Sequence, residues 1–190
     1  MVNQTMITAF ELSKKITNSL GLKIDIREED RDDAYFEFSS DDAAVYIANV
    51  PLRNIAHAEN RELKTSIAFS AVLEEAKHAI KSYHFDIDLE DCFLYCTFAI
   101  LHELGHYYTF VHEPDKFSAL IDEREKRCKR LKTLLQLNAN LGHDEADSRV
   151  DYEHGYRNIP FEKKADDYAK RLMPRVLAKL LTEAGSDEAE

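Results

Sequence analysis

Hydrophobic residues recur three and four positions apart along most of this chain, which is the spacing of one face of an α-helix. The pattern predicts helices over residues 6–20, 60–83, 91–110, 120–135 and 160–181. Gly21 is a natural end for the first helix, and Pro160 stands at a favourable first-turn position of the last. Pro174 is expected to kink or restart that last helix. The polar stretch "NANLGHDEADSRVDYEHGYRN" (138–158) is expected to be a loop.

Short runs of β-forming residues lie between the first two helices. They are "LKIDI" (22–26), "AYFEF" (34–38) and "AAVYIANV" (43–50), and they predict three strands, the last ended by Pro51. The acidic stretch "REEDRDD" (27–33) is expected to be a solvated loop. We therefore expect a mainly helical α+β fold with a small β-sheet.

The length fits one domain over residues 1–185, and the low glycine and proline content favours helices over a sandwich with many tight turns. Within it, residues 113–159 form an inserted, charged and partly helical segment, and residues 186–190 an acidic disordered tail.

The charge balance narrows the range of partners. The net charge is −11, so direct nucleic-acid binding is not expected, whereas a basic protein partner would be suited. Cys92, Cys96 and Cys128 are too few and odd in number for a disulfide framework, and we interpret them as buried thiols in a reducing compartment. The chain shows no secretory signal, and its longest apolar run, 93–101, is about half a membrane span. We expect a cytoplasmic protein without a membrane segment.

The stretch "HELGH" carries the strongest chemical signal in the sequence. On a helix, His102 and His106 lie one turn apart and project from the same face, so both imidazoles can reach one metal ion. Glu103 is placed to take a proton from a water that the metal activates. The ligand types favour Zn²⁺, with Mn²⁺ as the alternative. The sequence therefore predicts a metallohydrolase site in which Glu103 is the general base.

Two residues compete for the third ligand position. His112 occupies the metzincin position, but that arrangement needs a sharp turn at a glycine, and Thr109 stands there instead. Glu162 opens a later helix, with Asp166 one turn further on, as in gluzincins. We favour Glu162 as the ligand over the alternative of an exposed acidic first turn. Asp166 is expected to accept a hydrogen bond from a ligating histidine, His102.

The polar stretch 138–158 contributes three further candidates. His143 and His154 are weaker ligand candidates. His154 and Tyr156 are also candidate hydrogen-bond donors to the oxyanion of a tetrahedral intermediate, although both can equally be loop residues without a role.

Together "HELGHYY" and "EKKADDYAKRLMP" resemble the ImmA/IrrE family of metallopeptidases, with "AAVYIAN" similar to the strand that precedes the helices in that family. The resemblance implies a minimal zincin-like core in which His102, His106 and Glu162 hold zinc and Glu103 is the base. It further implies a zinc-dependent endopeptidase that cleaves a helix-turn-helix repressor of a mobile element, a phage or a stress regulon. The alternatives are a metal-stabilised module that sequesters a protein partner without catalysis, and a protease of another target such as a toxin–antitoxin component.

Overall fold

The computed structural model describes residues 7–31, 33, 35–58, 63–83, 85 and 89–186. In chain order its elements are α1 (Ala9–Leu20), β1 (Asp25–Glu29), β2 (Phe36–Ser39), β3 (Ala44–Ala48), α2 (Leu52–Ala58), α3 (Leu63–Ile80), α4 (Asp91–His112), α5 (Pro114–Asn140), α6 (Glu145–Arg157) and α7 (Pro160–Ser186). The predicted class, mainly helical α+β with a small sheet, is confirmed.

The sheet has the strand order β1-β3-β2, so β3 is central and β2 forms one edge. β1 pairs with β3 in parallel and β2 pairs with β3 antiparallel. β3 is the most buried of the three strands, and of its residues only Tyr46 is partly exposed, as a central strand requires. β1, however, extends to Glu29, so the expected loop from residue 27 onward is wrong for its first three residues. β1 is an edge strand held by backbone pairing, and its charged side chains do not give the alternating apolar signal of a half-buried strand.

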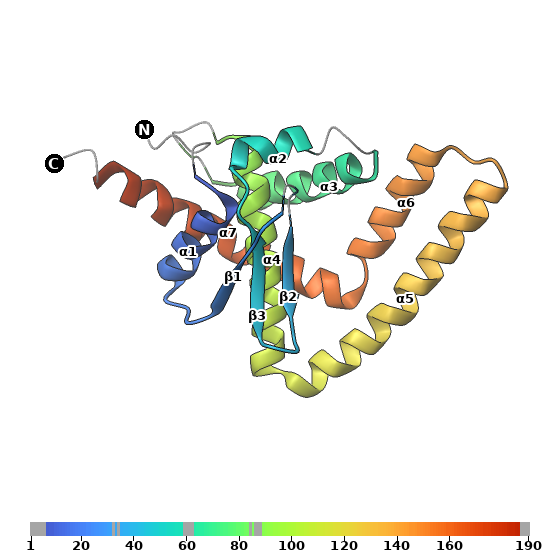
Figure 1. Ribbon diagram of the computed structural model, residues 1–190, viewed down its shortest axis with the longest axis horizontal. Coiled ribbons are helices and arrows are strands. Elements are labelled where there is room, and N and C mark those ends of the chain that lie inside the picture. Colours follow the sequence, from blue (N-terminus) through green and yellow to red (C-terminus); the bar gives the residue numbers. More distant parts are fainter. Residues whose placement is uncertain are drawn as a thin grey trace.

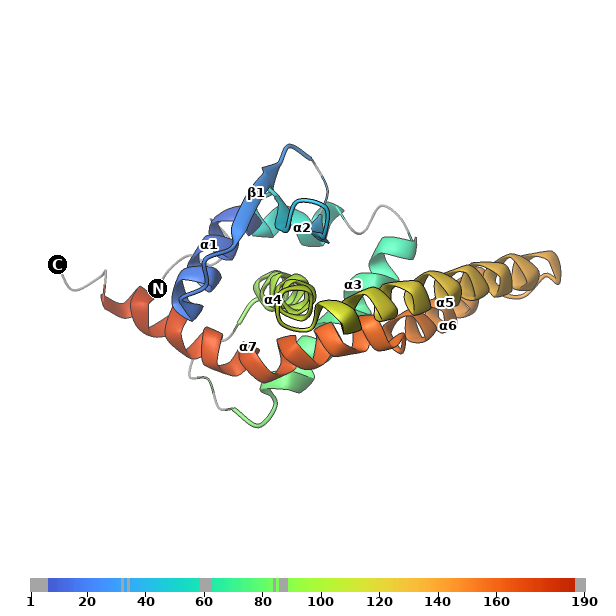
Figure 2. The ribbon, with the colours of Figure 1, turned by 90° about the horizontal axis from the view of Figure 1, so that it is seen from below.

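Helix α4 is the central element of the molecule. Figure 2 shows it end-on, with α1, α2 and the sheet on one side and α7 on the other. Residues from Cys92 to Thr109 are buried on most of its circumference, which explains why its sequence is so apolar. α4 runs two residues beyond the predicted end, through His112, and Thr109 lies inside the helix. The main hydrophobic core joins α4 to α1, β3, α3 and α7.

Helices α5 and α6 form a hairpin that projects from the rest of the molecule (Figure 1). The prediction of a loop over 138–158 is therefore wrong, because residues 145–157 are helical. The side chain of Asp144 caps this helix by accepting a hydrogen bond from the Asp147 N–H (3.1 Å). α6 contacts α5 through Tyr156, which accepts a hydrogen bond from Arg124, and through Gly155, which lies against Leu131. It has no regular apolar stripe, so the helical period is weak in its sequence.

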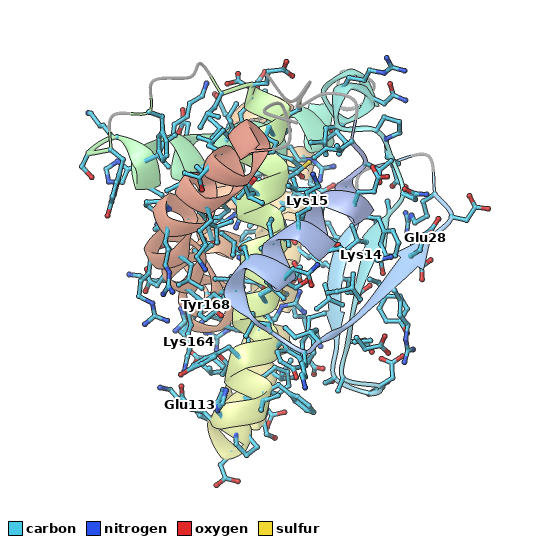
Figure 3. The ribbon with its side chains drawn as sticks, turned by 90° about the vertical axis from the view of Figure 1, so that its left-hand side faces the viewer. Lys14, Lys15, Glu28, Glu113, Lys164 and Tyr168 are labelled. Carbon is cyan, nitrogen blue, oxygen red and sulfur yellow. The ribbon has the colours of Figure 1, made fainter. Side chains whose placement is uncertain are left out.

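Helix α7 returns from the hairpin and lies along α4. It is one helix through Pro174, so the expected restart at that proline does not occur. Figure 3 shows Lys164 and Tyr168 on α7 beside α4, with Glu113 at the end of α4. Lys164 Nζ donates to Glu113 Oε1 (2.6 Å), an ion pair that links the start of α7 to the junction of α4 and α5.

Several expectations lie outside the described residues. They are the first residues of the helices predicted from positions 6 and 60, the first residue of the strand predicted over 34–38, and the acidic end at 187–190. Among the described helices, none combines the length and the apolarity that a membrane crossing requires.

Candidate metal centre

The two histidines of "HELGH" point from one face of α4 into the interior. His102 is 7 % exposed and His106 is 6 % exposed, and their rings are perpendicular. Their Nε2 atoms lie 3.0 Å apart. A helix places residues i and i+4 on the same face, so this convergence follows from the local sequence alone.

Glu162 reaches this pair from the first turn of α7 and is 1 % exposed. Its Oε2 lies 3.2 Å from His102 Nε2 and 3.5 Å from His106 Nε2. Tetrahedral zinc with ligands at about 2.0–2.1 Å requires ligand atoms about 3.3 Å apart. The three separations of 3.0, 3.2 and 3.5 Å scatter around this value, and the donor set of two imidazoles and one carboxylate suits zinc. These residues therefore fit a zinc ion.

Asp166 lies one turn beyond Glu162 and contacts the other nitrogen of His102. Its Oδ1 is 2.7 Å from His102 Nδ1, and the side chain is buried. In the neutral ring, which is the form that can bind a metal, the proton of His102 is thereby held on Nδ1, and the lone pair of Nε2 is directed toward Glu162 and His106. This is the contact that the sequence predicted for Asp166.

The titration behaviour of the three groups follows from their shared burial. Burial lowers the pKa of His102, but the hydrogen bonds to Asp166 and Glu162 outweigh it and raise that pKa to about 9. Burial lowers the pKa of His106. For Glu162, burial favours the neutral acid, yet the two histidines outweigh it and its pKa is lowered. Without a metal, a proton on His102 therefore balances the Glu162 carboxylate.

Gly105, inside the motif, lets α4 and α7 approach closely enough for these residues to meet. A Cβ at this position would lie 2.9 Å from Ala165 Cα and 3.1 Å from Tyr168 Cβ, both on α7. Phe161, next to Glu162, stacks on the His106 ring with centroids 4.0 Å apart and thereby fixes the plane of that ring. The close contact of the helices and this stacking set the geometry of the site.

A cavity of about 590 Å³ opens onto the histidine pair. Its walls come from β2, α4, α5 and the junction of α6 and α7, and they include Glu103, Phe38, Arg124 and Tyr156. Glu103 is half-buried there, and its Oε2 accepts a hydrogen bond from the backbone N–H of Phe38 (2.8 Å). The carboxylate is thus held at the edge of the cavity beside the two imidazoles.

Two arginines of the site were missed in the sequence. Arg124 Nε donates to Glu162 Oε1 (2.5 Å), and Arg157 Nη1 donates to Asp166 Oδ1 (2.7 Å). Arg124 stands in a run of charged residues on α5, where nothing distinguishes it from solvated neighbours. It lies 38 residues from Glu162 in sequence, so only the fold of the hairpin could reveal the contact.

Of the remaining candidate residues, only Tyr156 is among those that line the described cavity. His112 is exposed at the end of α4, where its ring faces Tyr108, and His143 is exposed between α5 and α6. His154 is exposed on α6 and is not among the residues that line the described cavity. Tyr156 does line it, and its hydroxyl accepts a hydrogen bond from Arg124 (3.0 Å). Burial raises the pKa of Tyr156, so its hydroxyl keeps its proton at neutral pH.

The comparisons with known proteins assign this chain to no family. No family model matches the sequence, and the searches of curated proteins and of solved structures find no match. The resemblance to the ImmA/IrrE metallopeptidases therefore stays a prediction that depends on the two sequence motifs.

Proposed function

We propose that this protein is a zinc-dependent endopeptidase. The observation that carries the proposal is the convergence of His102, His106 and Glu162, three buried side chains from two helices, with all their ligand atoms within 4.8 Å of one another. Glu103, which lies on α4 with the two histidines, faces the cavity beside these three residues. Two imidazoles and a carboxylate that leave one position open are typical of catalytic zinc sites, whereas structural sites close all four positions.

The roles of the residues follow from their positions. A zinc ion held here would act as a Lewis acid that polarises the scissile carbonyl and lowers the pKa of the attacking water. Glu103 takes the proton of that water and passes it to the leaving amide nitrogen, as general base and then general acid. The hydrogen bond from the Phe38 N–H keeps the carboxylate of Glu103 in place for both transfers. The O–H of Tyr156 is the candidate donor to the oxyanion.

Strand β2 offers a way to hold an extended peptide. The carbonyl of Tyr35 accepts a hydrogen bond from Ala48, so it points to β3, whereas the N–H of Phe38 points away from β3 toward Glu103. The backbone N–H and C=O groups of a strand alternate in direction from one residue to the next. Phe36, two residues before Phe38, therefore also directs its backbone groups toward the open edge of the sheet. A substrate strand can add to such an edge through main-chain hydrogen bonds. Its scissile bond would then lie over the histidine pair.

We propose a protein substrate, and the resemblance to the ImmA/IrrE family favours a helix-turn-helix repressor of a mobile element, a phage or a stress regulon. A net charge of −11 suits a basic substrate of this kind. Three free thiols fit activity in the reducing cytoplasm.

The test uses the purified protein loaded with Zn²⁺ and helix-turn-helix repressors from the same genome as candidate substrates. Glu103→Gln should retain one zinc per chain and lose cleavage, by a factor of about 100 or more, because it removes the proton acceptor and keeps the ligands. Glu162→Ala should lose the zinc. His112→Ala is the matched control on the same helix, and it should retain both zinc and cleavage.

Three outcomes would contradict the proposal. Full zinc retention by Glu162→Ala would remove the ligand assignment. Wild-type protein that binds no zinc would remove the site. A Glu103→Gln variant that relieves repression as fully as wild type would point to sequestration of the partner instead of cleavage.

A further inference from the structure

The α5–α6 hairpin contributes a charged group directly to the metal centre. Arg124 is the eleventh residue of the long helix α5, and its guanidinium reaches the carboxylate of Glu162 on α7. It is 37 % exposed, against 2 % for the Glu162 side chain. The arginine therefore lies between the buried ligand and the open cavity.

The two oxygens of Glu162 have different partners. Oε2 faces the Nε2 atoms of His102 and His106, whereas Oε1 accepts from Arg124 Nε. A free carboxylate can bind a metal through one oxygen or through both. With Oε1 held by a charged donor, only Oε2 is available to the metal position.

Arg124 is itself fixed by further contacts. Its Nη2 donates to the hydroxyl of Tyr156 (3.0 Å), and its guanidinium carbon lies 5.7 Å from the centre of the Phe161 ring and 5.8 Å from that of the Tyr156 ring. Phe161 in turn stacks on His106. Because the arginine is held by both Tyr156 and Phe161, it can fix the direction of the Glu162 carboxylate rather than follow it.

We propose that Arg124 is a positioning residue of the metal centre, which restricts Glu162 to one metal-binding oxygen and so makes the hairpin a part of the site. The inference rests on the metal site of the proposed function. Hydrogen bonds to metal-ligating side chains orient them, and their removal weakens metal affinity or activity about 10- to 100-fold. A merely structural ion pair would instead stabilise the hairpin without altering how the metal is bound.

The experiment measures metal binding by the full chain without any substrate. Zn²⁺ affinity is measured by competition with a chromophoric chelator, and coordination is followed through the visible absorption of bound Co²⁺, which weakens as the coordination number rises. The variants are Arg124→Ala and Arg124→Lys. Arg127→Ala is the matched control, because Arg127 lies on the same helix and pairs with Glu123 at the surface.

We expect Arg124→Ala to bind Zn²⁺ about 10- to 100-fold more weakly and to lose Co²⁺ absorption, as both oxygens of Glu162 become available. Arg124→Lys, which keeps the charge but not the planar fork, should fall between this variant and wild type. Arg127→Ala should match wild type in both measurements. If Arg124→Ala does not fold, Arg124→Lys carries the same comparison.

Two results would overturn the inference. One is a Zn²⁺ affinity within about twofold of wild type together with an unchanged Co²⁺ spectrum in a folded Arg124 variant, a result that leaves the proposed peptidase intact. The other is a wild-type protein that binds neither ion, which would remove the proposed function as well. Cleavage measured on the wild type separates the two cases.

Discussion

Gly105→Ala tests the idea that the close contact of α4 and α7 assembles the metal centre. The added methyl group would lie 2.9 Å from Ala165 Cα, and ordinary contact begins at 3.4 Å. The neighbours include backbone atoms that cannot rotate away, so the two helices must separate by about 0.5 Å or the methyl group must stay overpacked. Metal–ligand distances tolerate only about 0.2 Å, so the ligands on the two helices would no longer fit one ion.

The magnitude follows from two opposing effects. Overpacking at a site of this kind costs about 1–3 kcal/mol, and the backbone contact favours the upper end of that range. Alanine regains about 1 kcal/mol of helix propensity relative to glycine. We therefore expect the free energy of unfolding to fall by about 2 kcal/mol, and the affinity for Zn²⁺ to fall at least about tenfold.

Chemical denaturation of the metal-free protein and Zn²⁺ competition measure the two effects separately. Gly155→Ala is the matched control, because its methyl group would meet the Cδ2 end of the Leu131 side chain at 2.5 Å, which can turn aside. That variant should keep its Zn²⁺ affinity and lose little or no stability. A Gly105→Ala protein that is as stable as wild type and binds Zn²⁺ as tightly would refute the reasoning.

Two further predictions concern the histidines and their partners. The pKa of His102 is raised to about 9, whereas that of His106 is lowered. Below pH 9, Zn²⁺ must therefore displace one proton on binding, the proton on His102. The affinity measured by titration calorimetry should rise about tenfold per pH unit from 7 to 9 and level off above, and an affinity that is flat over this range would contradict the assignment. Asp166→Asn removes the carboxylate that holds the His102 Nδ1 proton and should weaken Zn²⁺ binding about 10- to 100-fold. Asp167→Asn, on the adjacent exposed position, is its control, and equal affinities for the two variants would show that Asp166 does not orient the ligand.

The local parts of the fold could be predicted because they depend on neighbouring residues. The period of the apolar residues placed α4 within two residues of its end, and Gly21 ends α1 in a left-handed conformation (φ 66°) as expected. The loop predicted over 138–158 is wrong because the structure of this segment depends on contacts with residues outside it. Helix α6 is stabilised by its packing on α5, and its own sequence carries too few apolar residues to show a helical period.

The sequence by itself determined the pairing of His102 with His106, because the helical repeat brings positions four apart onto one face. It also supplied Glu162 and Asp166 as candidates through their spacing on a second helix. Only the tertiary structure decided that this helix meets α4 at Gly105, and that Arg124 crosses from the hairpin to the far oxygen of Glu162. The physical reason is that contacts between residues far apart in the chain depend on how helices pack, and no local pattern of residue types encodes the direction in which a surface arginine will point.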